Sequence, residues 1–201
     1  MPYCVAVCGG IASGKSSICT LLEIAGATLV DADIIARDLV KPNEPALYEI
    51  EQRLGSQFIL KDGSLDRVAL RTHVFSDPKA KQILENILHP RIQSELLRQS
   101  EQAKTTYVAV AIPLLSPSTR IAAYAWINRV MVVETPELMQ QSRIMARDGC
   151  SLEIAKAMIA AQLSYQERLS MADDVVINDA SIELLQQWAT RLHERYLSKT
   201  A

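Results

Sequence analysis

Residues 9–16 have the types and spacing of a phosphate-binding loop. They read Gly9-Gly-Ile-Ala-Ser-Gly-Lys-Ser16 and match the pattern G-x-x-x-x-G-K-[ST]. Glycines let such a loop curl so that its N–H groups point at phosphate oxygens. Lys15 is expected to reach the β- and γ-phosphates of a nucleoside triphosphate, and the Ser16 hydroxyl to hold Mg²⁺. The motif therefore predicts a site for a triphosphate with magnesium.

The neighbouring residues favour this interpretation over a chance glycine-rich turn. An apolar run at residues 3–8 precedes the motif, and apolar side chains at helical spacing follow it from residue 15 to 25. A strand, the loop and a helix are therefore expected in this order. The helix would direct its positive N-terminal end at the phosphates. The residues expected to bind ATP here are Gly9, Gly10, Ala12, Ser13, Gly14, Lys15, Ser16 and Ser17.

Two carboxylates follow the second apolar run, which covers residues 27–30. Asp31 and Asp33 lie two residues apart, so in an extended chain both side chains would lie on one side. The carboxyl ends of strands line the ligand crevice in open α/β sheets, and a carboxylate there can accept the proton of an attacking hydroxyl. We predict that Asp33 is this base and that Asp31 is mainly structural. Helix capping is the alternative for both.

Two arginines could neutralise phosphate charge from a mobile segment. Arg143 and Arg147 lie four residues apart in a predicted helix after Pro136, so they share a face. Such a face suits a lid that closes over a triphosphate and stabilises the transition state. The alternative is a solvated face paired with Glu137 and Asp148.

Three further groups of residues give weaker signals of acceptor or metal binding. His89 precedes a proline, and a lone histidine more often makes a structural hydrogen bond. Arg37, one turn after Asp33, could meet an anionic acceptor or pair with Asp38. The cysteines and histidines lack the spacing of a metal site, so we expect neither zinc nor haem, and reduced thiols as in the cytosol. The cysteines are Cys4, Cys8, Cys19 and Cys150.

Other motifs restrict the class of triphosphate enzyme. A GTPase would also show DxxG and NKxD, and the sequence contains neither. A motor or transporter ATPase would normally be much longer than 201 residues. A small kinase remains, which needs a base for the acceptor hydroxyl, a lid and an acceptor pocket.

The elements that would position these residues alternate between strands and helices. Continuous apolar runs, which are typical of parallel strands covered on both faces, occur at residues 3–8, 27–30, 107–112, 129–134 and 175–178. We predict an α/β fold of three layers, with a five-stranded parallel sheet between helices. The whole chain is expected to form one domain with a core of residues 1–33, 105–135 and 171–201. A helical acceptor-binding insertion is expected at 34–104 and a helical lid at 136–170.

Local signals predict where several helices begin and end. Thr135 is expected to cap a helix that has Pro136 at its first position. A helix opened by Pro78 is expected to run to residue 88 and to break at His89-Pro90. In the helix after Asp66, Leu70 and Phe75 are expected to pack inward.

Composition narrows the choice of partners. Lys and Arg total 21 and Asp and Glu total 23, so the formal net charge is −2 and no global basic field is present to hold nucleic acid. The apolar runs are too short to span a membrane, and the first residues lack the basic region of a secretory signal. We therefore expect a cytoplasmic protein with small-molecule substrates, without nucleic-acid or membrane partners, and leave its oligomeric state open.

Beyond the loop, the sequence resembles the dephospho-coenzyme A kinases over nearly its whole length. The resemblance is carried by a set of motifs in the same order along the chain. They are residues 9–16, Val30-Asp-Ala-Asp33-Ile-Ile-Ala-Arg37, Asp62-Gly-Ser-Leu-Asp-Arg67, His89-Pro-Arg-Ile92, Ile112-Pro-Leu-Leu115, Gln140-x-x-Arg143-x-x-x-Arg147-Asp148, Gln162 and Ala172-Asp-Asp-Val-Val-Ile-Asn178.

The resemblance implies a P-loop kinase that uses ATP and Mg²⁺ to phosphorylate the ribose 3′-hydroxyl of dephospho-coenzyme A, the last step of coenzyme A synthesis. It implies that Asp33 is the base and that Arg143 or Arg147 contacts phosphate. Arg37 and His89 would lie near the acceptor. Asn178 would join the ATP site.

Two positions depart from the family pattern. Ala12 stands where the family usually has glycine, and we expect little loss provided that its φ is negative. Ser116-Pro117 replaces an aromatic residue and a glutamate, which removes a carboxylate that could support Mg²⁺. A nucleoside or nucleoside-monophosphate kinase is the alternative enzyme, and a nucleotide-binding regulator without turnover is the alternative from another class.

Overall fold

The computed structural model of the chain describes residues 1–199 and contains two compact units. One unit is built from Met1–Asp31 together with the residues from Gln99 onward, and the other is Ala32–Arg98. We call them the sheet unit and the helical unit. The assignment of residues 34–104 to acceptor binding and of 136–170 to a lid stays a prediction.

The sheet unit contains five parallel strands in the order β2-β3-β1-β4-β5. Their bounds are β1 (Tyr3–Gly9), β2 (Thr28–Asp31), β3 (Tyr107–Ala111), β4 (Arg129–Glu134) and β5 (Asp174–Ile177). Val7 of the central strand lies between Ala111 of β3 and Met131 of β4 in the register. The predicted five-stranded parallel sheet is confirmed.

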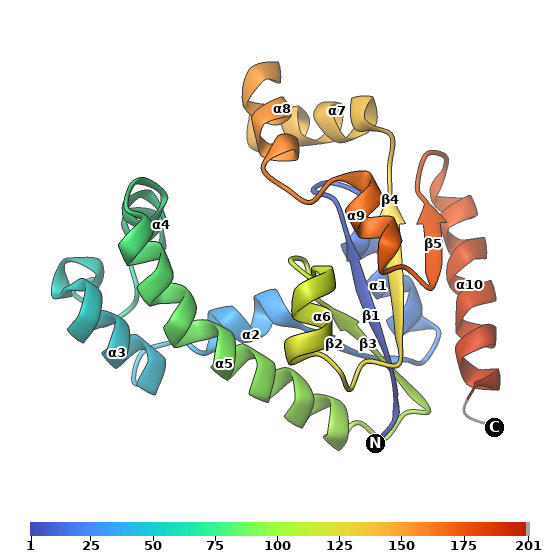
Figure 1. Cartoon of the computed structure of the whole chain (residues 1–201), viewed down its shortest axis with the longest axis horizontal. Helices are drawn as coiled ribbons and strands as arrows, with labels where there is room; N and C mark the ends of the chain where they lie inside the picture. The colour runs from blue at the N-terminus through green and yellow to red at the C-terminus, as the bar shows by residue number, and fades with distance from the viewer. Residues whose placement is uncertain (200–201) are drawn as a thin grey trace. The chain divides into compact units, whose positions relative to one another are not determined.

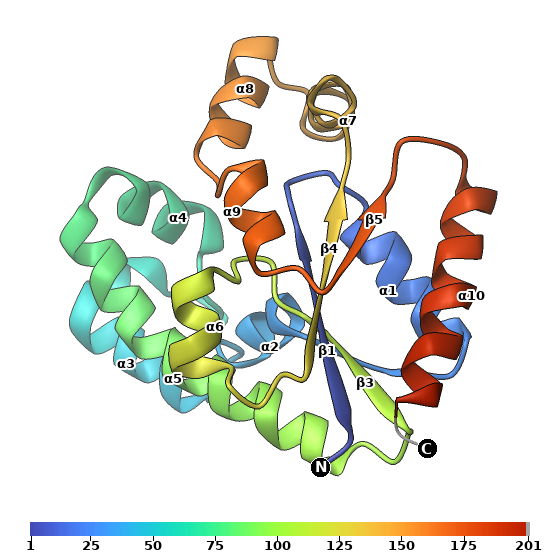
Figure 2. The ribbon, with the colours of Figure 1, turned by 45° about the vertical axis from the view of Figure 1, so that its right-hand side comes forward.

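Helices cover both faces of this sheet (Figure 1). Those of the sheet unit are α1 (Lys15–Ile24), α6 (Pro117–Ala123), α7 (Glu137–Asp148), α8 (Leu152–Ala160), α9 (Tyr165–Ser170) and α10 (Ile182–Ser198). In Figure 2, α1 and α10 lie together on one side of the strands, and α6 and α9 lie on the other. Because both faces are covered, the strands can be apolar on both sides, as their sequence predicts.

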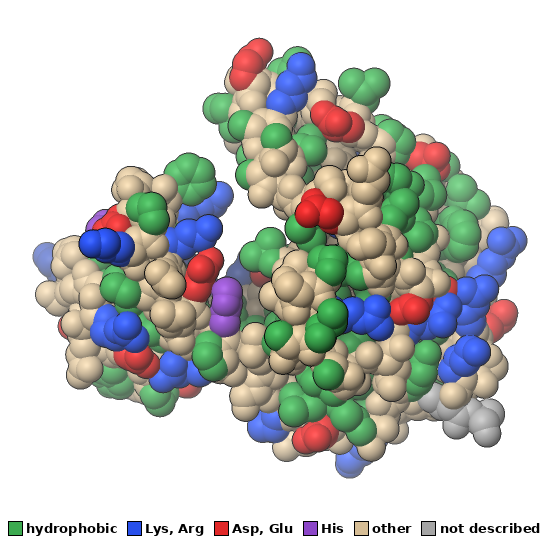
Figure 3. All heavy atoms as spheres, in the orientation of Figure 1, with side chains coloured by type: hydrophobic (Ala, Val, Ile, Leu, Met, Phe, Trp, Pro, Cys, Tyr) green, Lys and Arg blue, Asp and Glu red, His purple; other side chains and the backbone are tan. Residues whose placement is uncertain are grey.

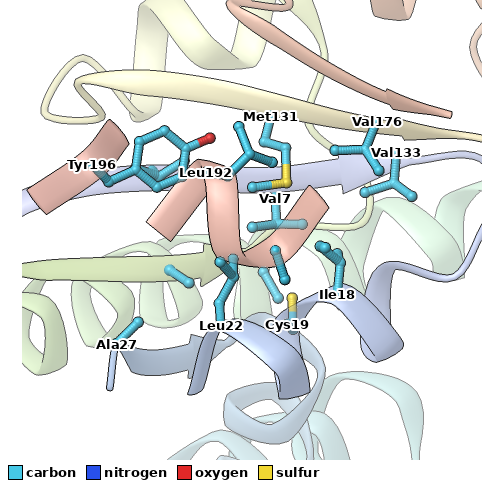
Figure 4. Packing of buried hydrophobic residues seen from close by; sticks show 14 of the residues in the cluster. Val7, Ile18, Cys19, Leu22, Ala27, Met131, Val133, Val176, Leu192 and Tyr196 are labelled. Atoms are coloured by element: carbon cyan, nitrogen blue, oxygen red, sulfur yellow. The ribbon is translucent and has the colours of Figure 1, made fainter. Parts of the chain in front are cut away.

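The core between the strands and the α1–α10 pair determines where the phosphate loop starts. Val7, Ile18 and Met131 are fully buried there, and Leu192 and Tyr196 of α10 pack against them (Figure 4). Burying each such side chain contributes about 1.5–3 kcal/mol. Because β1 and α1 are both fixed by this core, the loop between them is held at both ends.

The helical unit has a hydrophobic core of its own. Its elements are α2 (Ala32–Asp38), α3 (Pro45–Leu54), a 3₁₀ turn (Ser56–Phe58), α4 (Arg67–Ser76) and α5 (Pro78–Gln102), whose last turn continues into the sheet unit. Leu47, Ile50, Leu70 and Ile87 from α3, α4 and α5 are buried together with Phe58. Local capping supports this arrangement, because the Asp66 carboxylate accepts the Ala69 N–H at 2.9 Å at the start of α4.

The predicted helix break at His89-Pro90 is wrong, because α5 continues through Pro90. A proline inside a helix costs about 3 kcal/mol, since it removes one N–H and crowds the preceding turn. Tertiary contacts on either side outweigh this cost. Ile87 is fully buried, and the Arg91 guanidinium bonds the Ile87 carbonyl at 2.6 Å and Glu49 of α3 at 2.7 Å.

Two other local predictions are corrected by packing. Leu70 is buried as expected, but Phe75 is 92% exposed. Five residues along a helix correspond to about 140° around its axis, so the two side chains cannot share one face.

Thr135 does not cap α7, since it is buried and its hydroxyl bonds other backbone carbonyls, and Pro136 takes the cap position.

The helix α6 has no counterpart among the predicted elements. It begins where the sequence departs from the family pattern, and Ser116 caps it in a reciprocal arrangement with Thr119, with Pro117 at the first position. These residues therefore have a local structural role.

Within residues 1–199, none of the helices has the length and apolar character needed to cross a bilayer.

Candidate active site

The phosphate loop joins β1 to α1 and contains two positions that only glycine can occupy. Gly9 has φ 147° and Gly14 has φ 95°. A Cβ atom on Gly9 would lie 2.1 Å from the Val133 carbonyl oxygen, and one on Gly14 would lie 2.1 Å from Asn178 Nδ2. The β4 strand and the residue after β5 therefore contact the loop directly, and they leave no room for a side chain.

Ala12 does not have the negative φ that was expected. Its φ is 56°, in the left-handed region. A non-glycine residue pays about 1–2 kcal/mol for this conformation, because its Cβ approaches the following carbonyl oxygen. The alanine therefore carries strain that glycine would avoid, and surrounding contacts must hold the loop in place.

Lys15 at the start of α1 folds back over the first half of the loop. Its Nζ donates to the carbonyl oxygens of Gly9 at 2.9 Å and Gly10 at 2.8 Å. Ser16 and Ser17 are exposed in the first turn of α1, and no acidic residue lies in that turn. Lys15 and Ser16 thus begin α1 directly after the loop, and their roles toward a triphosphate and Mg²⁺ stay predictions.

The outer side of the loop is held by residues from the C-terminal half of the chain. The Ser13 carbonyl accepts the Thr135 hydroxyl at 3.0 Å and the Asn178 side-chain amide at 2.8 Å. The Thr135 hydroxyl also lies 2.9 Å from the Asn178 carbonyl oxygen. Ser13 itself is fully buried, and its hydroxyl has no hydrogen-bond partner among residues 1–199. These contacts fix the Ser13 carbonyl on the side of the loop that faces Thr135 and Asn178.

The structure brings one of the two predicted lid arginines to the loop. Arg143 of α7 donates to the Ala12 carbonyl at 3.2 Å, to the Thr135 hydroxyl at 3.2 Å and to the Asn178 carbonyl at 3.3 Å. Arg147 is exposed and pairs with its neighbour Asp148 at 2.7 Å.

An ion pair behind the loop joins β4 to α9. Arg168 is 12% exposed and Glu134 is 4% exposed, and the guanidinium binds both carboxylate oxygens. The hydrogen bond to Glu134 raises the pKa of Arg168, although burial opposes it. Arg168 also donates to the Leu163 carbonyl. The pair therefore fixes the turn between α8 and α9 against the end of β4.

This turn places Gln162 against the loop. Its Oε1 accepts the Ile11 N–H at 2.7 Å. A cavity of about 640 Å³ lies beside it, between α7, α8, α9 and the ends of β4 and β5, and includes Gln140 and Tyr165 in its lining. Sequence reasoning gave no role to Thr135, Glu134, Arg168 or Gln162 in this site. Only Gln162 carried a signal, as part of the family resemblance.

The two candidate carboxylates lie in different units. Asp31 is the last residue of β2, paired with Ala111 in the sheet register. Asp33 lies in the first turn of α2 and is exposed. The chain turns at Ala32, where β2 gives way to α2, so the two side chains do not follow one extended strand.

The candidate acceptor residues belong to the helical unit. Arg37 and His89 are both exposed, on α2 and α5 respectively. The Arg37 carbonyl accepts a hydrogen bond from Arg67 of α4 at 3.1 Å. A hollow of about 550 Å³ in this unit is lined by parts of α3 and α5, and neither Arg37 nor His89 is part of its lining.

The loop fits a magnesium ion that is bound mainly through phosphate. Among residues 1–199, no group of three or more His, Cys, Asp or Glu side chains could hold a metal ion alone. Magnesium beside nucleotides needs only one or two protein oxygens, since phosphate and water supply the others. The exposed hydroxyl of Ser16 at the first turn of α1 meets this requirement.

Comparisons with known proteins point to one family. The family model described as Dephospho-CoA kinase matches residues 3–183. A curated dephospho-CoA kinase of Xanthomonas oryzae pv. oryzae is 43% identical over 198 residues, covering 98% of this chain and 98% of that protein. One from Idiomarina loihiensis is 43% identical over 200 residues, covering 100% of this chain and 98% of that protein.

Solved structures agree with these relatives. A dephospho-CoA kinase from Campylobacter jejuni superposes with a TM-score of 0.75 at 30% identity, over 100% of both chains. A shikimate kinase from Acinetobacter baumannii has a TM-score of 0.56 at 14% identity, over 99% of this chain and 95% of that chain, which shows the fold alone. The predicted α/β P-loop kinase fold is confirmed. Since the family model and full-length relatives agree, the chain belongs to the dephospho-CoA kinase family.

Proposed function

We propose that this protein transfers the γ-phosphoryl group of ATP to the ribose 3′-hydroxyl of dephospho-coenzyme A, giving coenzyme A and ADP in the last step of coenzyme A synthesis. The observation that carries the proposal is the phosphate loop, with Lys15 folded over the Gly9 and Gly10 carbonyls, in a chain of this family. Such a loop recognises a triphosphate, and the family relationship supplies the acceptor.

On the donor side, the loop N–H groups and the N-terminus of α1 would bind the phosphates. Lys15 has three N–H donors, so it would bond the β- and γ-phosphates while keeping its bond to the Gly10 carbonyl. Ser16 would hold Mg²⁺, which would supply charge neutralisation between the phosphates. Asn178, which bonds the Ser13 carbonyl, would complete the ATP site from the sheet side.

On the acceptor side, we assign the general base to Asp33 and acceptor binding to Arg37 and His89. Asp33 follows directly after the turn that ends β2, and strand ends of parallel sheets face the ligand. The exposed carboxylate is available to accept the ribose proton as the oxygen attacks. Residues 34–104 would form the acceptor-binding insertion, and their length suits a bulky acceptor.

Residues 136–170 would act as the lid. Gly149, which is left-handed with φ 64°, ends α7, and we assign the hinge to it and to Pro136. Arg143 or Arg147 would bond ATP phosphate when the lid closes and would stabilise charge in the transition state.

Other features support small-molecule substrates in the cytoplasm. The net charge is −2, and charged side chains of both signs are interspersed on the face shown in Figure 3. All four cysteines are free thiols, as expected in a reducing compartment. A nucleoside or nucleoside-monophosphate kinase would share the donor site, but no feature of the loop favours it over the family's acceptor.

The test is an acceptor panel with purified protein, ATP and Mg²⁺. Dephospho-coenzyme A, adenosine, AMP and shikimate are supplied separately, ADP release is measured, and the product is mapped by phosphorus NMR. Rapid turnover with dephospho-coenzyme A and a phosphate on the ribose 3′-oxygen are expected. Lys15→Ala should remain folded and lose several orders of magnitude in rate. Preferred turnover of adenosine or AMP would overturn the assignment, and so would a Lys15→Ala rate within about tenfold of the parent, about 1.4 kcal/mol in barrier.

A further inference from the structure

The peptide group between Gly10 and Ile11 is bonded on both sides. Its carbonyl oxygen accepts Lys15 Nζ at 2.8 Å, and its N–H donates to Gln162 Oε1 at 2.7 Å. A trans peptide is planar, and its C=O and N–H point in opposite directions. Holding the N–H therefore also fixes the direction of the carbonyl that faces Lys15.

The backbone of Gln162 is fixed by contacts on both sides of the residue. The residue lies in the turn between α8 and α9, and its N–H donates to the Ile159 carbonyl at 3.1 Å. The next residue, Leu163, is held by Arg168, which is paired to Glu134 at the end of β4. A chain of contacts thus runs from the sheet through α9 to the Ile11 N–H.

A second glutamine packs on the same peptide group from α7. A Cβ atom on Gly10 would lie 2.7 Å from Gln140 Nε2, and Gln140 is 4% exposed. The α7–α9 segment therefore rests directly on the Gly10–Ile11 backbone. The neighbouring Ala12 is strained, with φ 56°, so this part of the loop depends on outside contacts to keep its conformation.

We propose that Gln162 is a positioning residue for phosphoryl transfer. It holds the Gly10–Ile11 peptide so that the Gly10 carbonyl faces Lys15. It thereby keeps the phosphate loop and Lys15 in a fixed position relative to the α7–α9 segment. The expected effect on kcat rests on the proposed function. The expected effect on the conformation of the loop does not. On this proposal the Ile11 N–H stays bonded to Gln162 when ATP binds, and the phosphates take N–H groups later in the loop.

The test compares Gln162→Met with Gln162→Glu. Methionine keeps the length and removes the acceptor, so the Ile11 amide should lose protection from hydrogen exchange measured by NMR. The rate constant kcat should fall about tenfold to a hundredfold, since small misplacements in a site have effects of this size, while the Kd for ATP stays within about threefold. Glutamate keeps the acceptor, so Ile11 protection should persist, while its charge beside the triphosphate raises KM for ATP.

The matched control is Gln166→Met, at an exposed glutamine on α9 that is not among the residues lining the cavity. It should leave Ile11 protection, kcat and ATP affinity unchanged. Tighter ATP binding by Gln162→Met would overturn the proposal, because it would mean that the glutamine competes with phosphate. Unchanged kcat or unchanged Ile11 protection in this variant would overturn it too. If dephospho-coenzyme A is not an acceptor at all, the proposed function fails, while the exchange and ATP-binding readouts still decide the role of Gln162.

Discussion

Arg143 of α7 donates a hydrogen bond to the carbonyl oxygen of Ala12 at 3.2 Å. The guanidinium therefore contacts the strained residue of the phosphate loop, and its other nitrogen bonds the Asn178 carbonyl. A planar fork with several donors can bridge two such carbonyls, whereas an ammonium group is a single point charge. Arg143 is thus placed to stabilise the loop.

Arg143→Lys should reduce phosphoryl transfer by roughly 10²–10³, the cost of removing one positioned donor in an active site. Arg147→Lys should have a smaller effect, because Arg147 pairs with its exposed neighbour Asp148. Single-turnover rates would measure both, with the exposed Arg191→Lys on α10 as control. Normal rates for both Arg143→Lys and Arg147→Lys would refute a transition-state role for either arginine.

Asp33→Asn should lower turnover by roughly 10²–10⁴, the usual contribution of a positioned acid or base. The amide keeps the size of the side chain but cannot take the ribose proton. ATP binding should survive, since the phosphate loop is untouched. Asp31→Asn should have the smaller effect, because Asp31 ends β2 and is assigned a structural role. Single-turnover transfer and nucleotide binding are measured for both. An inactive Asp31→Asn variant together with an active Asp33→Asn variant would mean that Asp31, and not Asp33, is the base.

Asp174 at the start of β5 should make stability depend on acid pH. Burial alone would raise the pKa of this carboxyl, but hydrogen bonds from Arg129, Tyr196 and Arg195 outweigh it and leave the pKa below its usual range. The stabilisation is therefore complete above the unfolded pKa of about 3.9 and is lost as pH falls through the folded value.

Asp174→Asn should cost roughly 3 kcal/mol at neutral pH, because it leaves a partly buried guanidinium without its counter-charge. The difference from the parent protein should shrink as pH falls below about 4, because the carboxylate is then protonated in the unfolded parent and, at still lower pH, in the folded one. Urea unfolding between pH 3 and pH 7 measures both quantities, and the exposed Asp179→Asn serves as control. A difference that stays constant down to pH 3 would contradict the assigned linkage.

Thiol labelling should distinguish Cys150 from the other three cysteines. Burial raises the pKa of Cys4 to about 11 and the pKa values of Cys8 and Cys19 to about 12, whereas Cys150 is half-buried between α7 and α8. Because the thiolate is the reactive form, one equivalent of Ellman's reagent should react rapidly at pH 8, and four should react in denaturant. Cys150→Ser should abolish the rapid phase. Fast labelling of Cys8, mapped by mass spectrometry, would contradict the prediction that Cys150 is the reactive thiol.

The sequence alone determined those features that depend on local backbone chemistry. The phosphate loop was predictable because glycine at residues 9 and 14 and the lysine and serine that follow act within one turn of chain. The five strands were predictable because a parallel sheet covered on both faces needs continuous apolar runs. The assignment of Asp33 as the base rests on its position after a strand and on the family resemblance, and it stays a prediction.

Tertiary structure decided the features that depend on which residues meet across long separations. Pro90 stays within a continuous helix because Ile87 and Arg91 are held by packing and by Glu49, contacts that no local pattern reveals. Gln162 reaches the Ile11 N–H across 151 residues only because the Glu134–Arg168 pair fixes the turn before α9. Side chains that hold a loop from outside carry no periodic or spacing signal, since their partners are backbone groups. The fold alone determines which side chains reach these groups.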